Sequence, residues 1–140
     1  MSTVQLLLVE DDDLDAEAFE RAIAAARILN PIHRVADGEE ALRRLRQTDA
    51  KAIPRPLMVL LDLNMPLMTG HEFLRELRRD ADPELRRMVV FVITTSSDRR
   101  DVIAAYDEHV AGFVTKSSSG YDFDRLIAML RSYWALVELP

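Results

Sequence analysis

Apolar residues along the chain occur in five short, mostly unbroken runs, separated by stretches in which they recur at helical spacing. Runs of this kind, ended by charged or turn-forming residues, are typical of buried strands. The predicted strands are Val4–Val9, Ile32–Val35, Leu57–Leu61, Met88–Ile93 and Gly112–Thr115. The periodic stretches predict helices with one apolar face. The predicted helices are Asp12–Ala26, Glu39–Leu45, His71–Arg79, Asp98–His109 and Tyr121 to about Val137.

Strand and helix therefore alternate five times, which predicts an α/β fold. Strands that are apolar throughout, rather than at every second residue, are typical of a parallel sheet covered on both faces. Right-handed crossovers place helices on both sides of such a sheet, which makes it doubly wound. No repeat, low-complexity tract or linker interrupts the 140 residues. We expect one domain over residues 1–140, with an apolar C-terminal tail at about 133–140.

The amino-acid composition argues against several classes of function. The net charge of −6 argues against a surface that binds nucleic acid, although mild acidity is also common among soluble domains. The absence of cysteine excludes disulfides, thiolate metal sites and thiol catalysis. The first apolar run, Val4–Val9, is too short to span a membrane and has no basic flank. We expect a cytoplasmic protein with neither a nucleic-acid nor a membrane partner.

Polar residues follow four of the five predicted strands. Glu10 and Asp11 come directly after the first strand, and Asp62 comes directly after the third. Thr94 follows the fourth strand and Lys116 the fifth. Taken singly, an acid or threonine there is usually a helix cap or loop residue, and a lysine is usually on the surface. In parallel sheets, however, ligands bind beyond the carboxyl ends of the strands, so we expect these residues to meet in one site.

Each of these groups suits a step of phosphoryl chemistry. Crowded carboxylates attract a hard divalent cation such as Mg²⁺, so Glu10, Asp11 and Asp62 predict a metal pocket. Asp62 can also attack phosphorus, since carboxylates act as nucleophiles that form acyl phosphates. The Lys116 ammonium and the Thr94 hydroxyl can each donate to a phosphoryl oxygen. The sequence therefore predicts that Asp62 accepts a phosphoryl group.

These motifs resemble those of response-regulator receiver domains, which are switched by phosphorylation in two-component signalling. The resemblance covers about residues 4–134. The segments that carry it are Leu8-Val9-Glu10-Asp11, Leu60-Leu61-Asp62-Leu63-Asn64-Met65-Pro66, Gly70, Thr94-Thr95 and Phe113-Val114-Thr115-Lys116. It implies a flavodoxin-like (βα)5 fold with strand order 2-1-3-4-5. It also implies a signalling protein rather than an enzyme.

The resemblance implies roles for the acidic residues. Asp62 takes a phosphoryl group from a phosphohistidine on a sensor histidine kinase. Asp11 and Asp62 are direct ligands of Mg²⁺, or of another divalent cation such as Mn²⁺ or Ca²⁺. The backbone carbonyl of Asn64 is the third protein ligand, and Glu10 is the other member of the acidic pair.

By the same resemblance, Thr94 and Phe113 form a switch pair, in which the hydroxyl moves to the phosphate and the aromatic ring turns inward. One position departs from the family. Its members usually have proline after the lysine, with a cis bond that aims the lysine, whereas Ser117 follows Lys116 here. A cis bond without proline costs about 3 kcal/mol. Either the loop holds such a bond at that cost, or Lys116 is aimed differently.

The C-terminal tail carries more apolar surface than a free terminus usually exposes. Its apolar residues are Tyr133, Trp134, Leu136, Val137 and Leu139. They are expected to cover this domain or a second copy of it. The tail and the long segment Asp80–Arg87 resemble the stand-alone response regulators that pair with bacterial or cyanobacterial phytochrome histidine kinases. That branch dimerises through its last helix and tail, which implies a homodimer, a phytochrome-type kinase partner and no output domain.

Two other functions stay open at this point. An aspartate-nucleophile phosphohydrolase usually has a second acid two residues after the nucleophile, where this chain has Asn64. That difference weakens the enzyme hypothesis but leaves slow self-hydrolysis possible. A scaffold that is never phosphorylated is disfavoured, because every strand-end residue of the site is intact.

Overall fold

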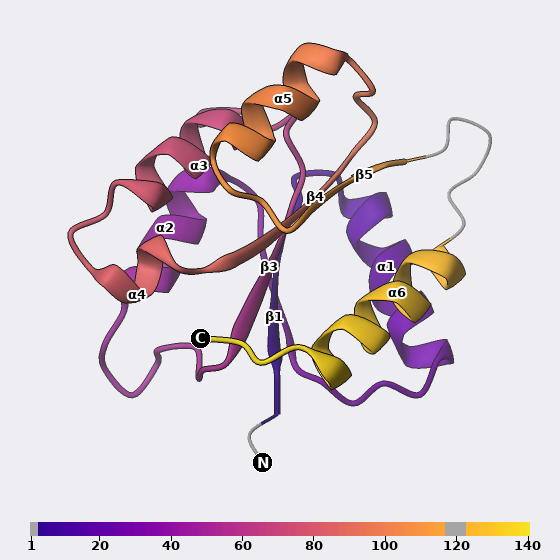
Figure 1. Ribbon diagram of the computed structural model, residues 1–140. Coiled ribbons are helices and arrows are strands. Elements are labelled where there is room, and N and C mark those ends of the chain that lie inside the picture. The colour runs from indigo at the N-terminus through magenta and orange to yellow at the C-terminus, as the bar shows by residue number, and fades with distance from the viewer. Residues whose placement is uncertain (1–2, 117–122) are drawn as a thin grey trace.

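Five parallel strands form one sheet in the order β2-β1-β3-β4-β5, in a computed structural model that describes residues 3–116 and 123–140 (Figure 1). The strands are β1 (Gln5–Val9), β2 (Ile32–Val35), β3 (Leu57–Leu61), β4 (Val89–Thr94) and β5 (Gly112–Thr115). The helices are α1 (Asp13–Ala25), α2 (Gly38–Arg46), α3 (Gly70–Arg78), α4 (Pro83–Arg86), α5 (Arg99–Asp107) and α6 (Phe123–Leu136). The predicted α/β class and strand order are confirmed.

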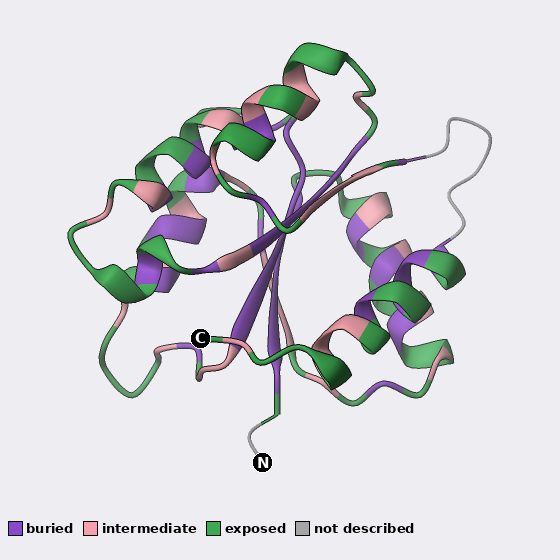
Figure 2. Ribbon diagram, in the orientation of Figure 1, coloured by how far each residue is buried: buried purple, intermediate pink, exposed green. Residues whose placement is uncertain are grey.

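Helices cover both faces of the sheet: α1 and α6 lie on one face, and α2 to α5 on the other (Figure 1). Successive residues of a strand point to opposite faces, so each central strand contributes to two cores. In β1, Leu7 and Val9 belong to the core under α2, α3 and α5, whereas Leu6 and Leu8 belong to the core under α1 and α6. Strands β1 and β3 are buried throughout (Figure 2). Both faces are thus filled, and the carboxyl edge of the sheet is left for function.

One helix was not predicted. The segment Asp80–Arg87 contains α4, whose first residue is Pro83 and whose cap is Asp82, which accepts a hydrogen bond from the backbone N–H of Glu84. A four-residue helix gives no periodic pattern, so only its cap and proline could have indicated it. The other predicted bounds agree to within about two residues, as is usual for helix and strand ends. Tyr121, the predicted start of the last helix, lies outside the described residues.

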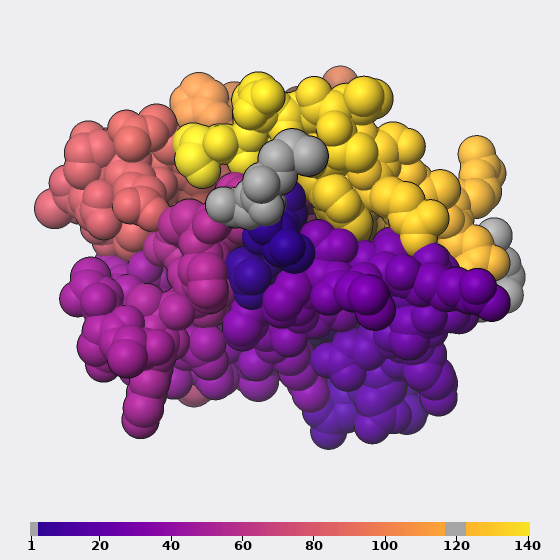
Figure 3. Space-filling model, turned by 90° about the horizontal axis from the view of Figure 1, so that it is seen from below, coloured from indigo at the N-terminus to yellow at the C-terminus, as the bar shows by residue number. Residues whose placement is uncertain are grey.

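The apolar residues of the C-terminal tail divide between two environments. Tyr133, Trp134 and Leu139 are partly buried and pack against the core under α1 and α6. Leu136 and Val137 are exposed. The tail lies beside Val4, the residue before β1, at one end of the molecule (Figure 3). Three of the five residues therefore cover their own domain, and two remain available to a partner. None of the helices within the described ranges has the length and apolar character needed to span a membrane.

Candidate functional site

Four polar side chains, each at or just beyond the end of a different strand, meet in a buried cluster at the carboxyl edge of the sheet. The strand register places the ends of β1, β3 and β4 side by side. Charged side chains are rarely buried unless they are paired. The four buried side chains are Glu10, Asp62, Thr94 and Lys116. Their positions agree with the convergence predicted from the strand ends.

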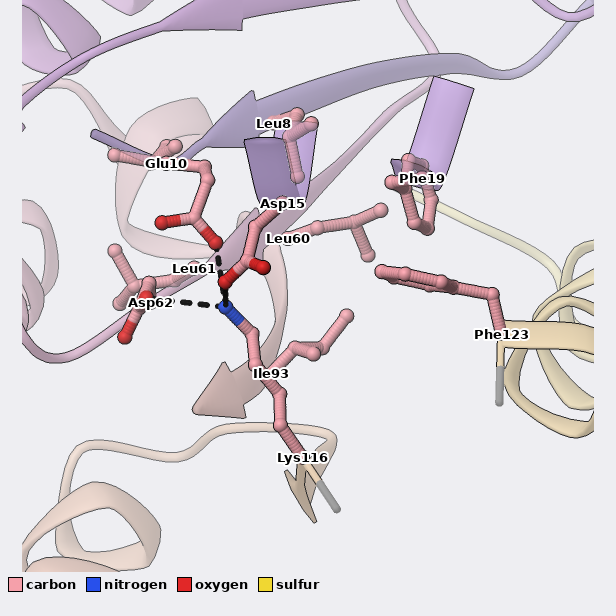
Figure 4. Close-up of a pocket in the computed structure, with 11 residues that line it drawn as sticks. Leu8, Glu10, Asp15, Phe19, Leu60, Leu61, Asp62, Ile93, Lys116 and Phe123 are labelled. Carbon is pink, nitrogen blue, oxygen red and sulfur yellow. Dashed lines mark hydrogen bonds and ion pairs between the residues drawn. The ribbon is translucent and has the colours of Figure 1, made fainter. Parts of the chain in front are cut away.

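The ammonium of Lys116 lies at the centre of this cluster (Figure 4). It donates to Glu10 Oε1 at 2.5 Å, to Asp15 Oδ2 at 2.8 Å and to Asp62 Oδ2 at 3.2 Å. Burial by itself lowers the pKa of Lys116, but the hydrogen bonds to Asp15 and Glu10 and the charge of Asp62 outweigh it and hold this pKa above its usual value. The lysine therefore stays charged, and it neutralises part of a strongly acidic cluster.

Both carboxylate oxygens of Asp62 are held in place. Oδ1 accepts from the hydroxyl of Thr94 at 3.0 Å and from the backbone N–H of Asn64 at 3.0 Å. Oδ2 accepts from Lys116 at 3.2 Å. The side-chain amide of Asn64 also donates to the hydroxyl of Thr95 at 3.3 Å, which joins the loops after β3 and β4. The carboxylate is therefore oriented and surrounded by donors that an incoming anionic group can use.

The carboxylates of the cluster also provide ligands for a divalent cation. One oxygen from each of Glu10, Asp11 and Asp62 lies within 4.8 Å of the others. Such hard oxygen ligands fit Mg²⁺, and the exposed position of Asp11 leaves room for the water ligands that this ion keeps. Burial raises the pKa of Glu10 to about 7 against the opposing hydrogen bond from Lys116, and the charge of Asp62 adds to the rise. A cation that binds Glu10 must therefore compete with a proton on this carboxyl.

This arrangement has counterparts among known proteins. The sequence profile of the response regulator receiver domain matches residues 6–131. The chain belongs to the response regulator receiver domain family. One relative, response regulator Rcp1 of Synechocystis sp., is 36% identical over 137 residues, which are 96% of this chain and 92% of that protein.

Solved structures of response regulators match this receiver domain over almost its whole length. The Mn²⁺-bound form of Rcp1 has a TM-score of 0.83 at 35% identity, with 99% of each chain covered. The phosphorylated cyanobacterial phytochrome response regulator RcpA has a TM-score of 0.86 at 33% identity, again with 99% of each chain covered. The bacteriophytochrome response regulator AtBRR has a TM-score of 0.76 at 27% identity, covering 100% of this chain and 99% of its own. These matches confirm the flavodoxin-like receiver fold.

The two residues predicted as the switch pair of the receiver domain lie on neighbouring strands. Thr94 ends β4, is fully buried and belongs to the acidic cluster through its bond to Asp62. Phe113 lies in β5, opposite Val92 of β4, and is only partly buried against the core under α2 to α5. Thr94 therefore contacts the phosphoryl-acceptor candidate, and Phe113 lies one strand away with part of its ring exposed.

Asp15 is a residue of the receiver site that the sequence prediction missed. It lies in the first turn of α1, beyond the acidic run that directly follows β1. Its carboxylate bonds to Lys116 although 101 residues separate the two in the chain. Helical spacing could have indicated it, because Asp15 precedes the buried Phe19 by four residues and therefore lies on the same face of α1.

A second polar group, made of three residues, lies beside the receiver site. The hydroxyl of Ser96 donates to Asp101 Oδ2 at 2.5 Å, and His71 Nε2 lies 3.0 Å from Asp101 Oδ1. Hydrogen bonds from Ser96 and His71 lower the pKa of Asp101. The group joins the loop after β4 to the first turns of α3 and α5, so a movement of that loop is linked to both helices.

Proposed function

We propose that this receiver domain accepts a phosphoryl group on Asp62 from a phosphohistidine of a sensor histidine kinase. The observation that carries the proposal is the Asp62 carboxylate, which is buried and accepts hydrogen bonds from Lys116 and Thr94. Family membership supports it, as does the phosphorylated state named for the similar protein RcpA. In the transfer, the bond from phosphorus to the histidine nitrogen breaks, a bond from phosphorus to an Asp62 oxygen forms, and the departing imidazole takes a proton.

The donors that now hold Asp62 are proposed to bind the transferred group. Lys116 and Thr94 would donate to phosphoryl oxygens, because both already donate to the carboxylate that receives the group. As Thr94 moves to the phosphoryl group, Phe113 would turn inward and change the surface over β4, β5 and α5. This change of surface is the proposed signalling output.

A divalent cation, most suitably Mg²⁺, is proposed to be part of the site. Glu10, Asp11 and Asp62 would hold it together with the backbone carbonyl of Asn64, and it would neutralise charge on the phosphoryl oxygens. The Mn²⁺-bound form named for the similar protein Rcp1 supports a divalent ion as part of the site. Mn²⁺ and Ca²⁺ are alternatives with the same oxygen ligands.

Phosphorylation can be tested by intact mass after incubation with Mg²⁺ and a small phosphodonor. The wild type is expected to gain one phosphoryl group and Asp62→Asn none, because the amide is not a nucleophile. Asp13→Asn, which removes an exposed carboxylate of the same region, is the matched control and should behave as wild type. A mass gain that persists in Asp62→Asn contradicts the proposal. Multiple turnover on small phosphoesters would instead favour the phosphohydrolase, which the amide at Asn64 disfavours.

The kinase partner is proposed to be a bacterial or cyanobacterial phytochrome. The names of RcpA and AtBRR, which match at high TM-score over nearly the whole chain, support this choice. We also propose a cytoplasmic location, where ATP-dependent kinases act, and no partner among nucleic acids, which the net charge of −6 disfavours.

Residues 1–140 are proposed to form one receiver domain that dimerises through its apolar tail. Leu136 and Val137 support the proposal because both are exposed beside the buried part of the tail. We expect Leu136→Glu to lower the mass measured by light scattering from dimer towards monomer, since a charge there opposes apolar contact. Leu29→Glu, at another exposed leucine, is the control. An unchanged mass for Leu136→Glu would refute a tail-mediated dimer.

A further inference from the structure

We propose that Asp15 competes with the phosphoryl group for Lys116: its carboxylate holds the lysine in the resting protein and releases it when Asp62 is phosphorylated. The inference rests on the proposed function of Asp62. Asp15 acts through the lysine and does not itself contact the phosphoryl group, so it is a positioning residue. Its effect is to make phosphorylation less favourable than it would be with a free lysine.

The first argument is a count of donors and acceptors. A lysine ammonium has three N–H donors. Lys116 has three carboxylate acceptors within hydrogen-bonding distance, of which Glu10 and Asp15 are closer to Nζ than Asp62. Phosphorylation turns the Asp62 carboxylate into an acyl phosphate, whose acceptor oxygens lie one bond further out, so Lys116 must weaken its bonds to the other two carboxylates to follow them.

The second argument decides which bond is given up. The side chains of Glu10 and Asp62 are 5% and 10% exposed, whereas that of Asp15 is 41% exposed. Water readily replaces the lysine at an exposed carboxylate, but a buried carboxylate that loses its partner is strongly destabilised. Of the two carboxylates that remain once Asp62 is phosphorylated, Asp15 is therefore the one that can release Lys116 at the lower cost.

The third argument concerns the cation. Glu10 and Asp62 are among the three carboxylates placed to share a metal ion, and Asp15 is not. When an ion engages Glu10 and Asp62, their oxygens are shared with it. Asp15 is then the carboxylate partner of Lys116 that does not also bind the ion. The competition is consequently strongest in the state that is ready for phosphoryl transfer.

The backbone of α1 fixes Asp15 in this position. Its N–H donates to the capping carboxylate of Asp12 at 3.0 Å, which holds the first turn of the helix. One turn further on, Phe19 packs edge-on against Phe123, with ring centroids 5.7 Å apart. Asp15 and both rings line one pocket, and the Asp15 carboxylate points at Lys116 (Figure 4). Helix α1 therefore holds the Asp15 carboxylate in place as an acceptor for Lys116.

Equilibrium binding of beryllofluoride with Mg²⁺ tests the competition, because this complex mimics a phosphoryl group on an aspartate and needs no turnover. Asp15→Asn keeps the size of the side chain but removes its charge, and we expect it to raise the affinity about threefold to tenfold. Asp13→Asn removes a carboxylate of the same turn whose partner is Arg34, at 2.6 Å, and should leave the affinity unchanged. Asp15→Glu, which restores the charge, should return the affinity towards wild type.

A nuclear magnetic resonance measurement reports on the lysine directly. The chain contains only two lysines, Lys51 and Lys116, so ¹⁵N-lysine labelling gives two side-chain signals, which Lys51→Arg assigns. In the wild type, the Lys116 signal should move when beryllofluoride binds. In resting Asp15→Asn, it should already be displaced from its wild-type position.

The outcomes separate this inference from the proposed function. An Asp15→Asn affinity equal to or below that of Asp13→Asn overturns the competition. If Asp15→Asn does not fold, a wild-type Lys116 signal that stays in place at saturating beryllofluoride overturns it as well. Failure of the wild type to bind beryllofluoride in an Asp62-dependent way contradicts the proposed function itself.

Discussion

Replacing Lys116 by methionine is expected to slow phosphoryl acceptance at Asp62 about 100-fold, the usual loss when one donor to a developing anion is removed. The same change should lower the free energy of unfolding of the metal-free protein by about 3 kcal/mol, because it leaves buried carboxylates without their cation. The ammonium lies within 3.2 Å of three carboxylate oxygens, and methionine can replace none of these bonds. Intact mass over time and urea unfolding measure the two effects.

The chain provides a matched control for this substitution. Lys51 is its only other lysine, and it is exposed, so Lys51→Met removes the same charge without touching the cluster. Saturating Mg²⁺ should recover part of the stability lost in Lys116→Met, because the ion supplies positive charge to the same carboxylates. Equal rates and stabilities for the two variants would refute the central position assigned to Lys116.

The pH dependence of metal binding follows from the raised pKa of Glu10, about 7 against an ordinary 4.5. The folded protein keeps this proton up to about pH 7, whereas the unfolded chain releases it near pH 4.5. The free energy of unfolding of the metal-free protein therefore falls as pH rises between these two values. A cation must displace the same proton, so its affinity should be about tenfold higher at pH 8 than at pH 6. Lys116→Met removes the hydrogen bond that lowers this pKa. The rise in cation affinity, measured by calorimetry, should therefore occur at a higher pH in this variant.

The sequence was sufficient to predict that the strand-end residues share one site, because parallel strands bring their carboxyl ends to the same edge of the sheet however the side chains pack. Asp62, Thr94 and Lys116 could be assigned to one site on that ground alone. Asp15 could not be assigned so directly, since its contact with Lys116 depends on the direction of α1 after the strand. Helix α4 was missed for another reason: four residues are too few for a period to show.

The tail shows a further limit of sequence patterns. Its apolar residues predicted a covered surface, but the pattern did not separate Tyr133 and Trp134, which pack on their own core, from the exposed Leu136. That separation depends on which face of α6 meets the sheet. A truncation after Ser132 would remove both groups together, so the point variant at Leu136 is the cleaner test of dimerisation.

Replacing Gly70 by alanine is expected to lower the free energy of unfolding by about 2 kcal/mol, as overfilling of a packed site usually does. A Cβ at this position would lie 2.6 Å from Leu63 Cα and 2.9 Å from the backbone oxygen of Asp62. Both atoms belong to the backbone and cannot turn aside. The chain must therefore shift, and the cost exceeds the gain of about 1 kcal/mol in helix propensity.

The shift should also reach the phosphoryl-acceptor site, because the backbone N–H of Gly70 donates to the carbonyl of Leu63, the residue after Asp62. We expect acceptance at Asp62 to slow about tenfold, since displacement of a reacting group by a fraction of an ångström is costly. Gly38→Ala is the control: its nearest obstacle is the thioether of Met68, a flexible side chain that can move away. If Gly70→Ala is as stable and as readily phosphorylated as Gly38→Ala, the loop after β3 is not held by this contact, and the fixed position of Asp62 must come from its hydrogen bonds to Thr94, Asn64 and Lys116.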